Sequence, residues 1–252
     1  MPATTISIAT HKGGTGKTVT AMAVSSALAR AGKKTLLIDL DPQGHSTIGL
    51  GLELTDGAPT VRDIFVDSAA SAAKIVRQTH IDELDVLPSN IRLERASHLI
   101  YTRPKREDVL RRALQPLMGT YAYIVIDCPP SLGPLTESAI GAADVILIPC
   151  QMEARAADGL VDLLEVVHII KGDSFDRWRI LLTRVDNRRT VTNEVVLESL
   201  APWKDKVLKT AIPQSEPLNQ AQIQRTDIFT FDAKSKGAAA YQTLVESELP
   251  NV

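Results

Sequence analysis

Residues Ile6–Thr20 read ISIATHKGGTGKTVT, a short hydrophobic run that leads into a glycine-rich loop. The β-branched residues at the start predict a buried strand, and the small residues of Ala21–Ala31 predict a helix after the loop. Glycines have no Cβ, so successive backbone N–H groups can turn toward an anion, and the start of the helix adds its positive end. Strand, glycine loop and helix together predict a phosphate-binding site.

The lysine and hydroxyl residues of this loop suit a nucleoside triphosphate. Lys17 supplies a mobile positive charge for the β- and γ-phosphates, and Thr18 places a hydroxyl where a bridging Mg²⁺ would sit. The usual pattern is G-x-x-x-x-G-K-[ST], but here the first glycine is displaced and the loop reads KGGTGKT. The residues that this pattern leads us to expect around the phosphates and Mg²⁺ are Gly13, Gly14, Thr15, Gly16, Lys17 and Thr18.

Acidic residues follow two further hydrophobic runs. Thr35–Asp39 continues to Asp41 and a DPQG turn, and Tyr123–Asp127 ends in the Walker B pattern of an apolar strand with a terminal aspartate. Open α/β sheets bind ligands at the carboxyl ends of their strands, so Asp39, Asp41 and Asp127 are expected near the phosphate loop. There a carboxylate can hold Mg²⁺, directly or through water, or orient an attacking water. Solvated turn residues are the alternative for Asp39 and Asp41.

Strand and helix patterns alternate along the chain, which predicts an α/β fold with a doubly wound, mainly parallel sheet flanked by helices, in one domain spanning 1–252. Further expected strands are Leu84–Pro88, Val145–Pro149, Ile180–Arg184 and Val207–Ile212. Further expected helices are Val61–Phe65, Ala69–Gln78, a helix starting near Pro104, Leu135–Ala143 and Ala238–Leu249, with a loop at Gln151–Ala157.

The composition excludes several classes of protein. Hydrophobic residues make up 44% and charged residues 23% of the 252 residues, so we expect a sizeable core. The net charge of −2 means that any nucleic-acid binding must come from a local patch. Cys128 and Cys150 form no C-x-x-C pair, which argues against a disulfide framework and a zinc or iron–sulfur site. Without a long apolar run or a leader, a cytoplasmic location is expected.

The loop Lys12–Thr18 resembles the deviant Walker A loop of the ParA/MinD superfamily of ATPases, and the resemblance extends over nearly the whole chain. It is greatest to short Soj-type partition ATPases without an N-terminal helix-turn-helix. The resemblance implies that Lys12 reaches the partner's nucleotide in an ATP-bound homodimer, that Asp41 positions the hydrolytic water, and that Asp39 supports the magnesium shell. The implied catalytic residues are Lys12, Lys17 and Asp41, and the implied metal residues are Thr18, Asp39 and Asp127.

The same resemblance implies further contacts and partners. Pro213 and Ser215 would contact the adenine, and Val19 stands where many relatives carry a second threonine that touches the α-phosphate. The ATP dimer would bind nonspecific DNA on the nucleoid, and a ParB-like or other partner with a basic N-terminal peptide would stimulate a weak ATPase. The candidate DNA contacts are Arg188, Arg189 and Arg225, with Lys204, Lys206 and Lys209 nearby in sequence. Solvated loop charges are the alternative reading of these residues.

Two other functions within the superfamily remain open. A MinD-like regulator needs a basic amphipathic C-terminal helix to bind a membrane, but Tyr241–Leu249 is acidic, so we expect no membrane binding. A relative of the nitrogenase iron protein needs paired cysteines in another motif context. The basic stretch Thr102–Arg112 is either a solvated helix face or a phosphate or partner contact. The leading prediction is an ATPase that partitions DNA or positions another cargo.

Overall fold

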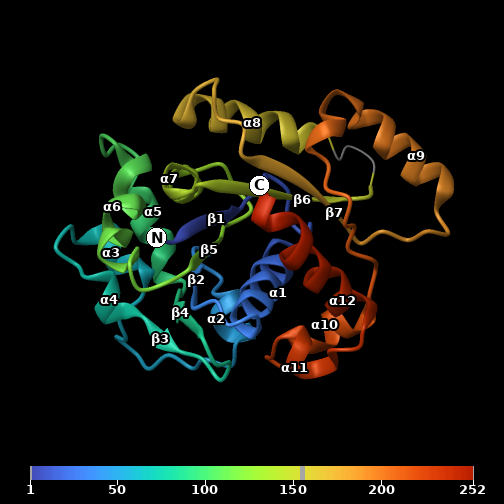
Figure 1. The fold of residues 1–252 in the computed structure, drawn as a ribbon. Coiled ribbons are helices and arrows are strands. Elements are labelled where there is room, and N and C mark those ends of the chain that lie inside the picture. The colour runs from blue at the N-terminus through green and yellow to red at the C-terminus, as the bar shows by residue number, and fades with distance from the viewer. Residues whose placement is uncertain (1, 154–156, 252) are drawn as a thin grey trace.

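The computed structural model describes residues 2–153 and 157–251, and a seven-stranded sheet lies at its centre, in the order β3-β4-β2-β5-β1-β6-β7 (Figure 1). Neighbouring strands pair in parallel, except that β3 is antiparallel to β4 at one edge. The prediction of a mainly parallel sheet is therefore confirmed. The strands are β1 Thr4–Ile8, β2 Thr35–Asp39, β3 Arg77–Gln78, β4 Leu84–Leu87, β5 Tyr123–Asp127, β6 Val145–Gln151 and β7 Trp178–Thr183.

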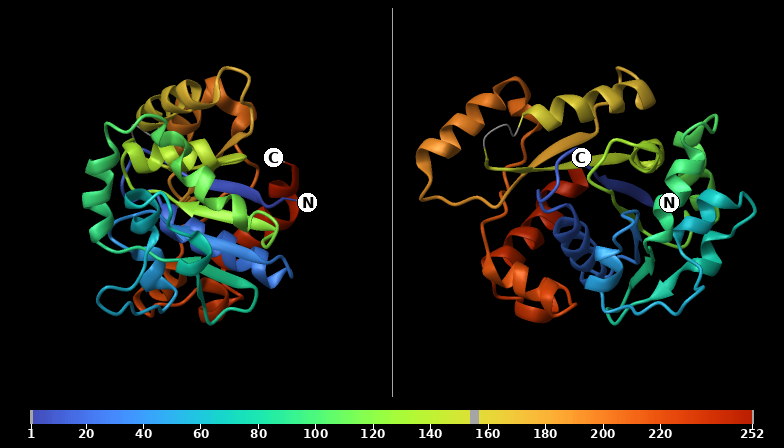
Figure 2. Two further views of the ribbon diagram at one scale, coloured as in Figure 1. Left: turned by 90° about the vertical axis from the view of Figure 1, so that its left-hand side faces the viewer. Right: turned by 180° about the vertical axis from the view of Figure 1, so that it is seen from behind.

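Helices cover both faces of this sheet (Figures 1 and 2). Helices α3, α5, α6, α7 and α8 pack on one face, and α1, α10, α11 and α12 pack on the other. The helices on the first face, with the connecting ones, are α2 His45–Gly49, α3 Val61–Val66, α4 Ala72–Ile75, α5 Arg92–Ile100, α6 Val109–Leu114, α7 Pro134–Ala142, α8 Asp158–Lys171 and α9 Thr190–Ser199. The helices of the second face are α1 Lys17–Arg30, α10 Glu216–Ile223, α11 Ile228–Asp232 and α12 Lys236–Thr243.

The strands are apolar at consecutive positions because both of their faces are buried. In β2, Leu36 and Ile38 join the cluster on the first face, whereas Leu37 joins the cluster on the second. In β5, Ile124 and Val125 divide in the same way. A strand buried on both faces needs apolar side chains in both directions, since successive side chains alternate.

Two predicted helices were wrong in extent. Ala69–Gln78 contains only the short helix α4, and its last two residues form β3, because the edge of β4 accepts an antiparallel partner there. The helix expected from Pro104 begins later, with a 3₁₀ turn at Arg106–Asp108 followed by α6. Lys105 has a left-handed φ of 55°, which interrupts a right-handed helix at that point.

The strand predicted at Val207–Ile212 was also wrong. This segment and its continuation make only isolated bridges to the region of β7, at Val207 and Pro213. The Glu248 carboxylate accepts the backbone N–H groups of Lys209 and Thr210, at 2.9 and 2.7 Å, so these groups are not available to a strand. The expected final helix consists of α12, a π-helical turn Leu244–Glu248 and a 3₁₀ turn Leu249–Asn251. The loop expected at Gln151–Ala157 lies partly outside the described residues.

Candidate functional site

The carboxyl ends of three adjacent strands bring the predicted site residues together. Asp39 at the end of β2 pairs in register with Asp127 at the end of β5, and Asp127 pairs on its other side with Ile8 of β1. The glycine loop leaves β1 at this same edge. Residues that lie far apart in the sequence therefore meet because parallel strands end together.

The glycine loop has the backbone that its sequence demands. Gly14 and Gly16 have φ values of 75° and 90°, a conformation that side-chain-bearing residues rarely adopt. Gly16 also caps α1, and the Thr20 N–H donates to its carbonyl at 2.8 Å. The Thr183 hydroxyl, at the end of β7, donates to the Thr15 carbonyl at 2.8 Å. The loop is thus tied both to α1 and to the sheet.

Lys17 is held inside the loop. Its side chain is buried, and its ammonium donates to the Lys12 carbonyl at 2.9 Å. Burial lowers the pKa of this amine, and the nearby Asp127 carboxylate opposes that effect. A buried ammonium that is hydrogen-bonded to one carbonyl keeps donors for an incoming phosphate.

Asp39 is fully buried and engaged by the following loop. Its Oδ2 accepts the Thr47 N–H at 2.8 Å and the Thr47 hydroxyl at 2.7 Å, and its Oδ1 accepts the Asp41 N–H at 3.2 Å. Burial raises the pKa of Asp39 to about 6, and the hydrogen bonds from Thr47 counteract this rise. In this structure Asp39 fixes the loop that carries Asp41.

Asp127 has one oxygen that is free to take a further partner. Its Oδ2 accepts the Ser46 hydroxyl at 2.7 Å, but its buried Oδ1 accepts no hydrogen bond from the described residues. Burial and then the Asp39 charge raise the pKa of Asp127 to about 7, while the Ser46 hydrogen bond and the nearby Thr18 hydroxyl lower it. A buried carboxylate oxygen without a partner, beside a hydroxyl, fits a hard cation such as Mg²⁺.

No group of three or more His, Cys, Asp or Glu side chains that could hold a metal occurs in the described part of the chain. Mg²⁺ usually keeps several waters and binds through one or two protein groups and substrate phosphates. Thr18 and Asp127 therefore suit a metal that arrives with a nucleotide.

Asp41 lines the same cavity as the glycine loop. This cavity of about 470 Å³ is lined by Gly13, Gly14, Lys17 and Thr18 of the loop and by Asp41. The Asp41 carboxylate accepts the Gln43 N–H at 2.9 Å and is 8% exposed. Because it lines the same cavity as Lys17, its carboxylate can orient a water that attacks a phosphate bound there. We call this space the phosphate cavity.

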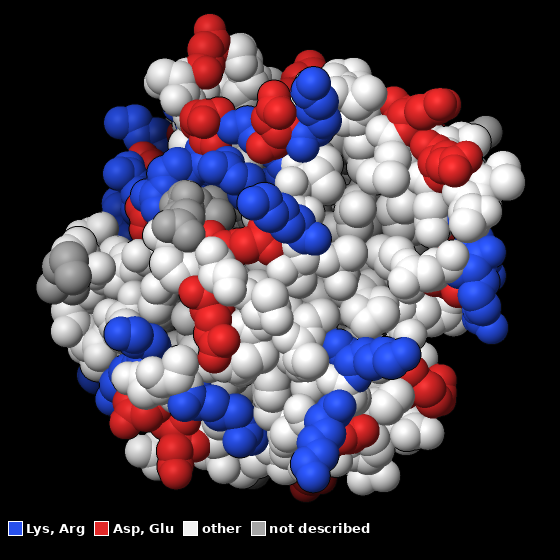
Figure 3. Space-filling model, turned by 45° about the vertical axis from the view of Figure 1, so that its right-hand side comes forward, with Lys and Arg blue, Asp and Glu red and all other residues white. Residues whose placement is uncertain are grey.

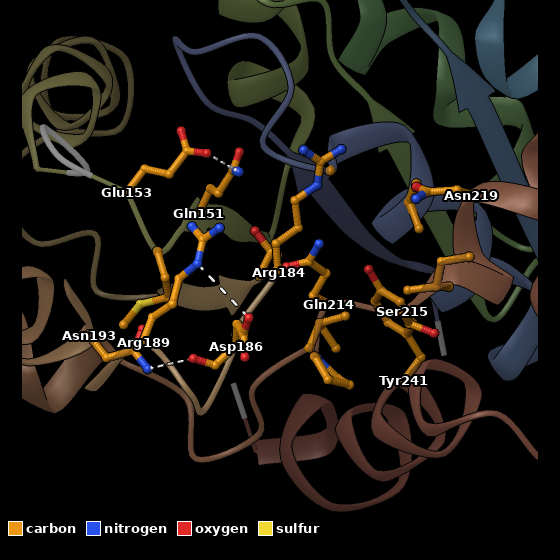
Figure 4. Close-up of a pocket in the computed structure, with 17 residues that line it drawn as sticks. Gln151, Glu153, Arg184, Asp186, Arg189, Asn193, Gln214, Ser215, Asn219 and Tyr241 are labelled. Atoms are coloured by element: carbon orange, nitrogen blue, oxygen red, sulfur yellow. Dashed lines mark hydrogen bonds and ion pairs between the residues drawn. The ribbon is translucent and has the colours of Figure 1, made fainter. Parts of the chain in front are cut away.

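A second cavity, of about 270 Å³, adjoins the phosphate cavity (Figure 4). Pro213 and Ser215, the predicted base contacts, line it, together with Tyr241, whose hydroxyl is within 2.9 Å of the Thr20 hydroxyl. We call it the base cavity. No sequence pattern predicted the other polar residues of its lining, which come from the ends of β6 and β7, the loops after them, α9, α10 and the segment before Ser215. They are Gln151, Glu153, Thr183, Arg184, Asp186, Arg189, Asn193, Gln214 and Asn219, of which Arg189 was predicted only as a DNA contact.

Lys12 does not line the phosphate cavity. It lines a separate small pocket of about 40 Å³ beside Cys150 and Leu160. A Cβ built on Gly159 of α8 would lie 3.3 Å from the Lys12 Cγ, so the glycine leaves room for this side chain. Lys12 and Lys17 thus belong to one loop, but Lys17 lines the phosphate cavity and Lys12 lines the small pocket.

The predicted DNA contacts are exposed and already paired. Arg188 donates to both oxygens of Asp186, at 2.9 and 2.8 Å, and holds the pKa of that carboxyl at about 2. Arg189 also faces Asp186, at 3.9 Å, whereas Arg225 pairs with Glu53 at 3.4 Å. Exposed pairs of this kind contribute little and exchange readily. The three arginines therefore stay candidates for binding phosphates.

The structure divides the basic residues between two ends of the sheet. Arg188 and Arg189 follow the carboxyl end of β7. The Lys206 ammonium instead donates hydrogen bonds to the carbonyl and carboxylate of Asp176, just before the amino end of β7. On one face of the molecule, lysine and arginine side chains gather with acidic residues among them (Figure 3). Lys206 and Arg188 thus lie near opposite ends of β7.

Comparison with known proteins identifies relatives over almost the whole chain. A family model described as an AAA domain matches residues 3–180. The sporulation initiation inhibitor protein Soj of Bacillus subtilis is 39% identical, over 98% of this chain and 98% of its own. The chromosome partitioning protein ParA of Myxococcus xanthus is 36% identical, over 95% of this chain and 85% of its own.

Solved structures of related proteins match the fold over almost the whole chain. Apo McdA of Cyanothece has a TM-score of 0.86 and 25% identity, covering 96% of this chain and 98% of its own. A plasmid partition protein of Borrelia burgdorferi bound to AMPPNP has a TM-score of 0.84 and 26% identity, covering 99% and 100%. A protein from Mycobacterium smegmatis described as cobyrinic acid a,c-diamide synthase, with an ATP analogue and magnesium, has a TM-score of 0.81 and 31% identity, covering 96% and 93%.

Proposed function

Because this chain belongs to the Soj- and ParA-type family of P-loop ATPases, we propose that it hydrolyses ATP to partition a chromosome or plasmid, or to position another cargo. One observation carries the proposal: Lys17, Thr18 and Asp41 converge on one phosphate cavity at the carboxyl edge of the sheet. Relatives named for partition match the chain over nearly its full length, which supports the cellular role.

The residues of the phosphate cavity suit phosphoryl transfer to water. The Lys17 ammonium and the N–H groups of the glycine loop stabilise charge on the transferred phosphoryl oxygens. The Asp41 carboxylate orients the attacking water opposite them. Thr18 and Asp127 would hold Mg²⁺, which when bound neutralises phosphate charge, while Asp39 keeps the Asp41 loop in place. The intrinsic rate is slow, and a ParB-like partner with a basic peptide accelerates it.

The place of Lys12 supports an ATP-bound homodimer. The Lys12 side chain lines a pocket outside the phosphate cavity of its own subunit, beside β6 and α8. We propose that it reaches the nucleotide of a partner subunit that faces the same edge of the sheet. Each subunit then completes the other's site, so that ATP controls assembly.

Nonspecific DNA is the proposed surface on which this dimer moves, in association with the nucleoid. Arg188, Arg189 and Arg225 are exposed, and their acidic partners hold them only through surface ion pairs. DNA phosphates can replace such partners, and they bind cations without reading sequence.

The packing of the last helical segment argues against a MinD-like membrane regulator. Leu244, Val245 and Leu249 are buried in the core on the α1 face, so they offer no apolar face to a lipid surface. In the described part of the chain, no helix has both the length and the apolar character needed to span a bilayer.

The test is binding of the Asp41→Ala protein to random-sequence duplex DNA, with ATP and with ADP, across a salt titration. This variant should form a stable ATP dimer, because nucleotide binding survives while water orientation fails. We expect DNA binding with ATP only, weakening steeply with salt. Lys17→Ala is the control, and it should neither dimerise nor bind DNA. ATP dimers that bind no DNA would contradict the DNA role and shift attention to a protein or membrane surface.

A further inference from the structure

Arg184 lies where the phosphate cavity and the base cavity join. Only three of the described lining residues belong to both cavities, namely Gly16, Val19 and Arg184. Gly16 offers backbone groups alone, and the side chain of Val19 is apolar. Arg184 is therefore the shared lining residue with a charged side chain, and it directly follows β7.

The backbone holds Arg184 in an unusual conformation. Its φ is 51°, the left-handed region that disfavours residues with a Cβ. Hydrogen bonds fix the chain on both sides: the Met152 N–H donates to the Thr183 carbonyl at 3.3 Å, and the Val185 N–H to the Ile212 carbonyl at 3.0 Å. A strained residue that is fixed on both sides at the edge of a binding cavity points to a functional constraint.

The Arg184 side chain has no acidic partner among the described residues. Its neighbours Arg188 and Arg189 both face Asp186, whereas Arg184 makes neither a hydrogen bond nor an ion pair within the described part of the chain. In Figure 4 its guanidinium points away from Asp186 and from Arg189. An exposed guanidinium in this position is available to an anion that enters the cavities.

We propose that Arg184 binds the nucleotide phosphate nearest the ribose, the α-phosphate. The inference rests on the proposed ATP site. A nucleotide that has its base in one cavity and its terminal phosphates beside Lys17 in the other must place its α-phosphate at their junction. Guanidinium matches phosphate through two parallel hydrogen bonds, and Val19 supplies no polar group at that point.

The experiment compares nucleotide affinities of Arg184→Asn with those of the wild type, by displacement of a fluorescent ADP analogue. Asparagine tolerates a left-handed backbone, so this variant removes the charge without adding strain. We expect ADP and AMP to bind about 10- to 100-fold more weakly, as for loss of one charge-assisted hydrogen-bonded contact, and adenosine to bind as in the wild type. Arg184→Lys keeps the charge but not the planar fork, and should fall between the two.

Lys105→Asn is the matched control, because Lys105 is also basic, exposed and left-handed, with a φ of 55°, and lines neither cavity. It should bind ADP as the wild type does.

Adding Val19→Thr to Arg184→Asn places a hydroxyl at the same junction, and recovery of AMP affinity supports the assignment to the α-phosphate.

Two results would overturn the inference while the proposed function stands: Arg184→Asn binding ADP and AMP with wild-type affinity, or losing adenosine affinity to the same extent. If the wild type binds neither ATP nor ADP, the proposed function fails, and the role of Arg184 fails with it.

Discussion

Replacing Asp127 by asparagine should stabilise the nucleotide-free protein, although Asp127 is one of the two proposed Mg²⁺ ligands. Asp127 is fully buried, lies in register beside Asp39, and has one oxygen without a hydrogen-bond partner among the described residues. Such a carboxylate is unfavourable in its charged form until a cation binds. Asparagine has nearly the same shape and carries no charge.

The sign and size of the effect follow from the pKa of Asp127. Burial raises it to about 7 in the folded protein, against about 4 for an ordinary aspartate. Between these values the folded state binds more protons than the unfolded state, so the wild-type free energy of unfolding falls as pH rises from about 4 to 7. One pKa unit is worth about 1.4 kcal/mol, so the loss between pH 5 and pH 8 is at most about 3 kcal/mol. Asp127→Asn does not undergo this loss.

Urea unfolding at pH 5, 6, 7 and 8, in EDTA and without nucleotide, measures the difference directly. The stability advantage of Asp127→Asn should grow by about 1–3 kcal/mol from pH 5 to pH 8, with most of the growth below pH 7. Asp82→Asn is the control, because that aspartate is exposed. An advantage that does not change with pH, or a variant less stable than the wild type at pH 8, would refute the reasoning. The Mg²⁺-dependent ATPase activity of Asp127→Asn should be lost.

Other predictions concern packing and reactivity. Gly141→Ala should lower the melting temperature by several degrees, because the new Cβ would lie 2.0 Å from the Glu107 carbonyl oxygen. Overpacking of this kind costs about 1–3 kcal/mol. Gly119→Ala is the control and should leave the melting temperature unchanged, because its Cβ would meet no atom within 4 Å. Burial raises the pKa of Cys128 to about 12 and of Cys150 to about 11, so iodoacetamide should alkylate neither appreciably in the native protein at pH 8 and both after denaturation. Rapid native labelling would show that these thiols are accessible as thiolates.

The glycine loop of the phosphate cavity and the buried carboxylates near it were predictable because local patterns mark them. The glycine loop follows a strand, Asp39 and Asp127 each end one, and parallel strands end at one edge of the sheet. The base cavity could be predicted only through the resemblance, at Pro213 and Ser215. Its remaining lining residues come from separate loops and helices, and no local pattern marks them. Their meeting depends on the path of the chain after β7, where the sequence predicted a strand that does not form.

The loop after β7 shows why charge in a sequence does not establish a role. Arg184 and Arg188 are four residues apart and chemically identical, and the adjacent pair Arg188–Arg189 drew attention as a cluster. In the structure Arg188 donates to both oxygens of Asp186, so an incoming DNA phosphate must displace a carboxylate to reach it. Arg184 points into the junction of two cavities with no such competitor among the described residues. A cation acts through the anion that it can reach. The structural evidence that Arg184 binds a nucleotide phosphate is therefore stronger than the evidence that Arg188 and Arg189 bind DNA.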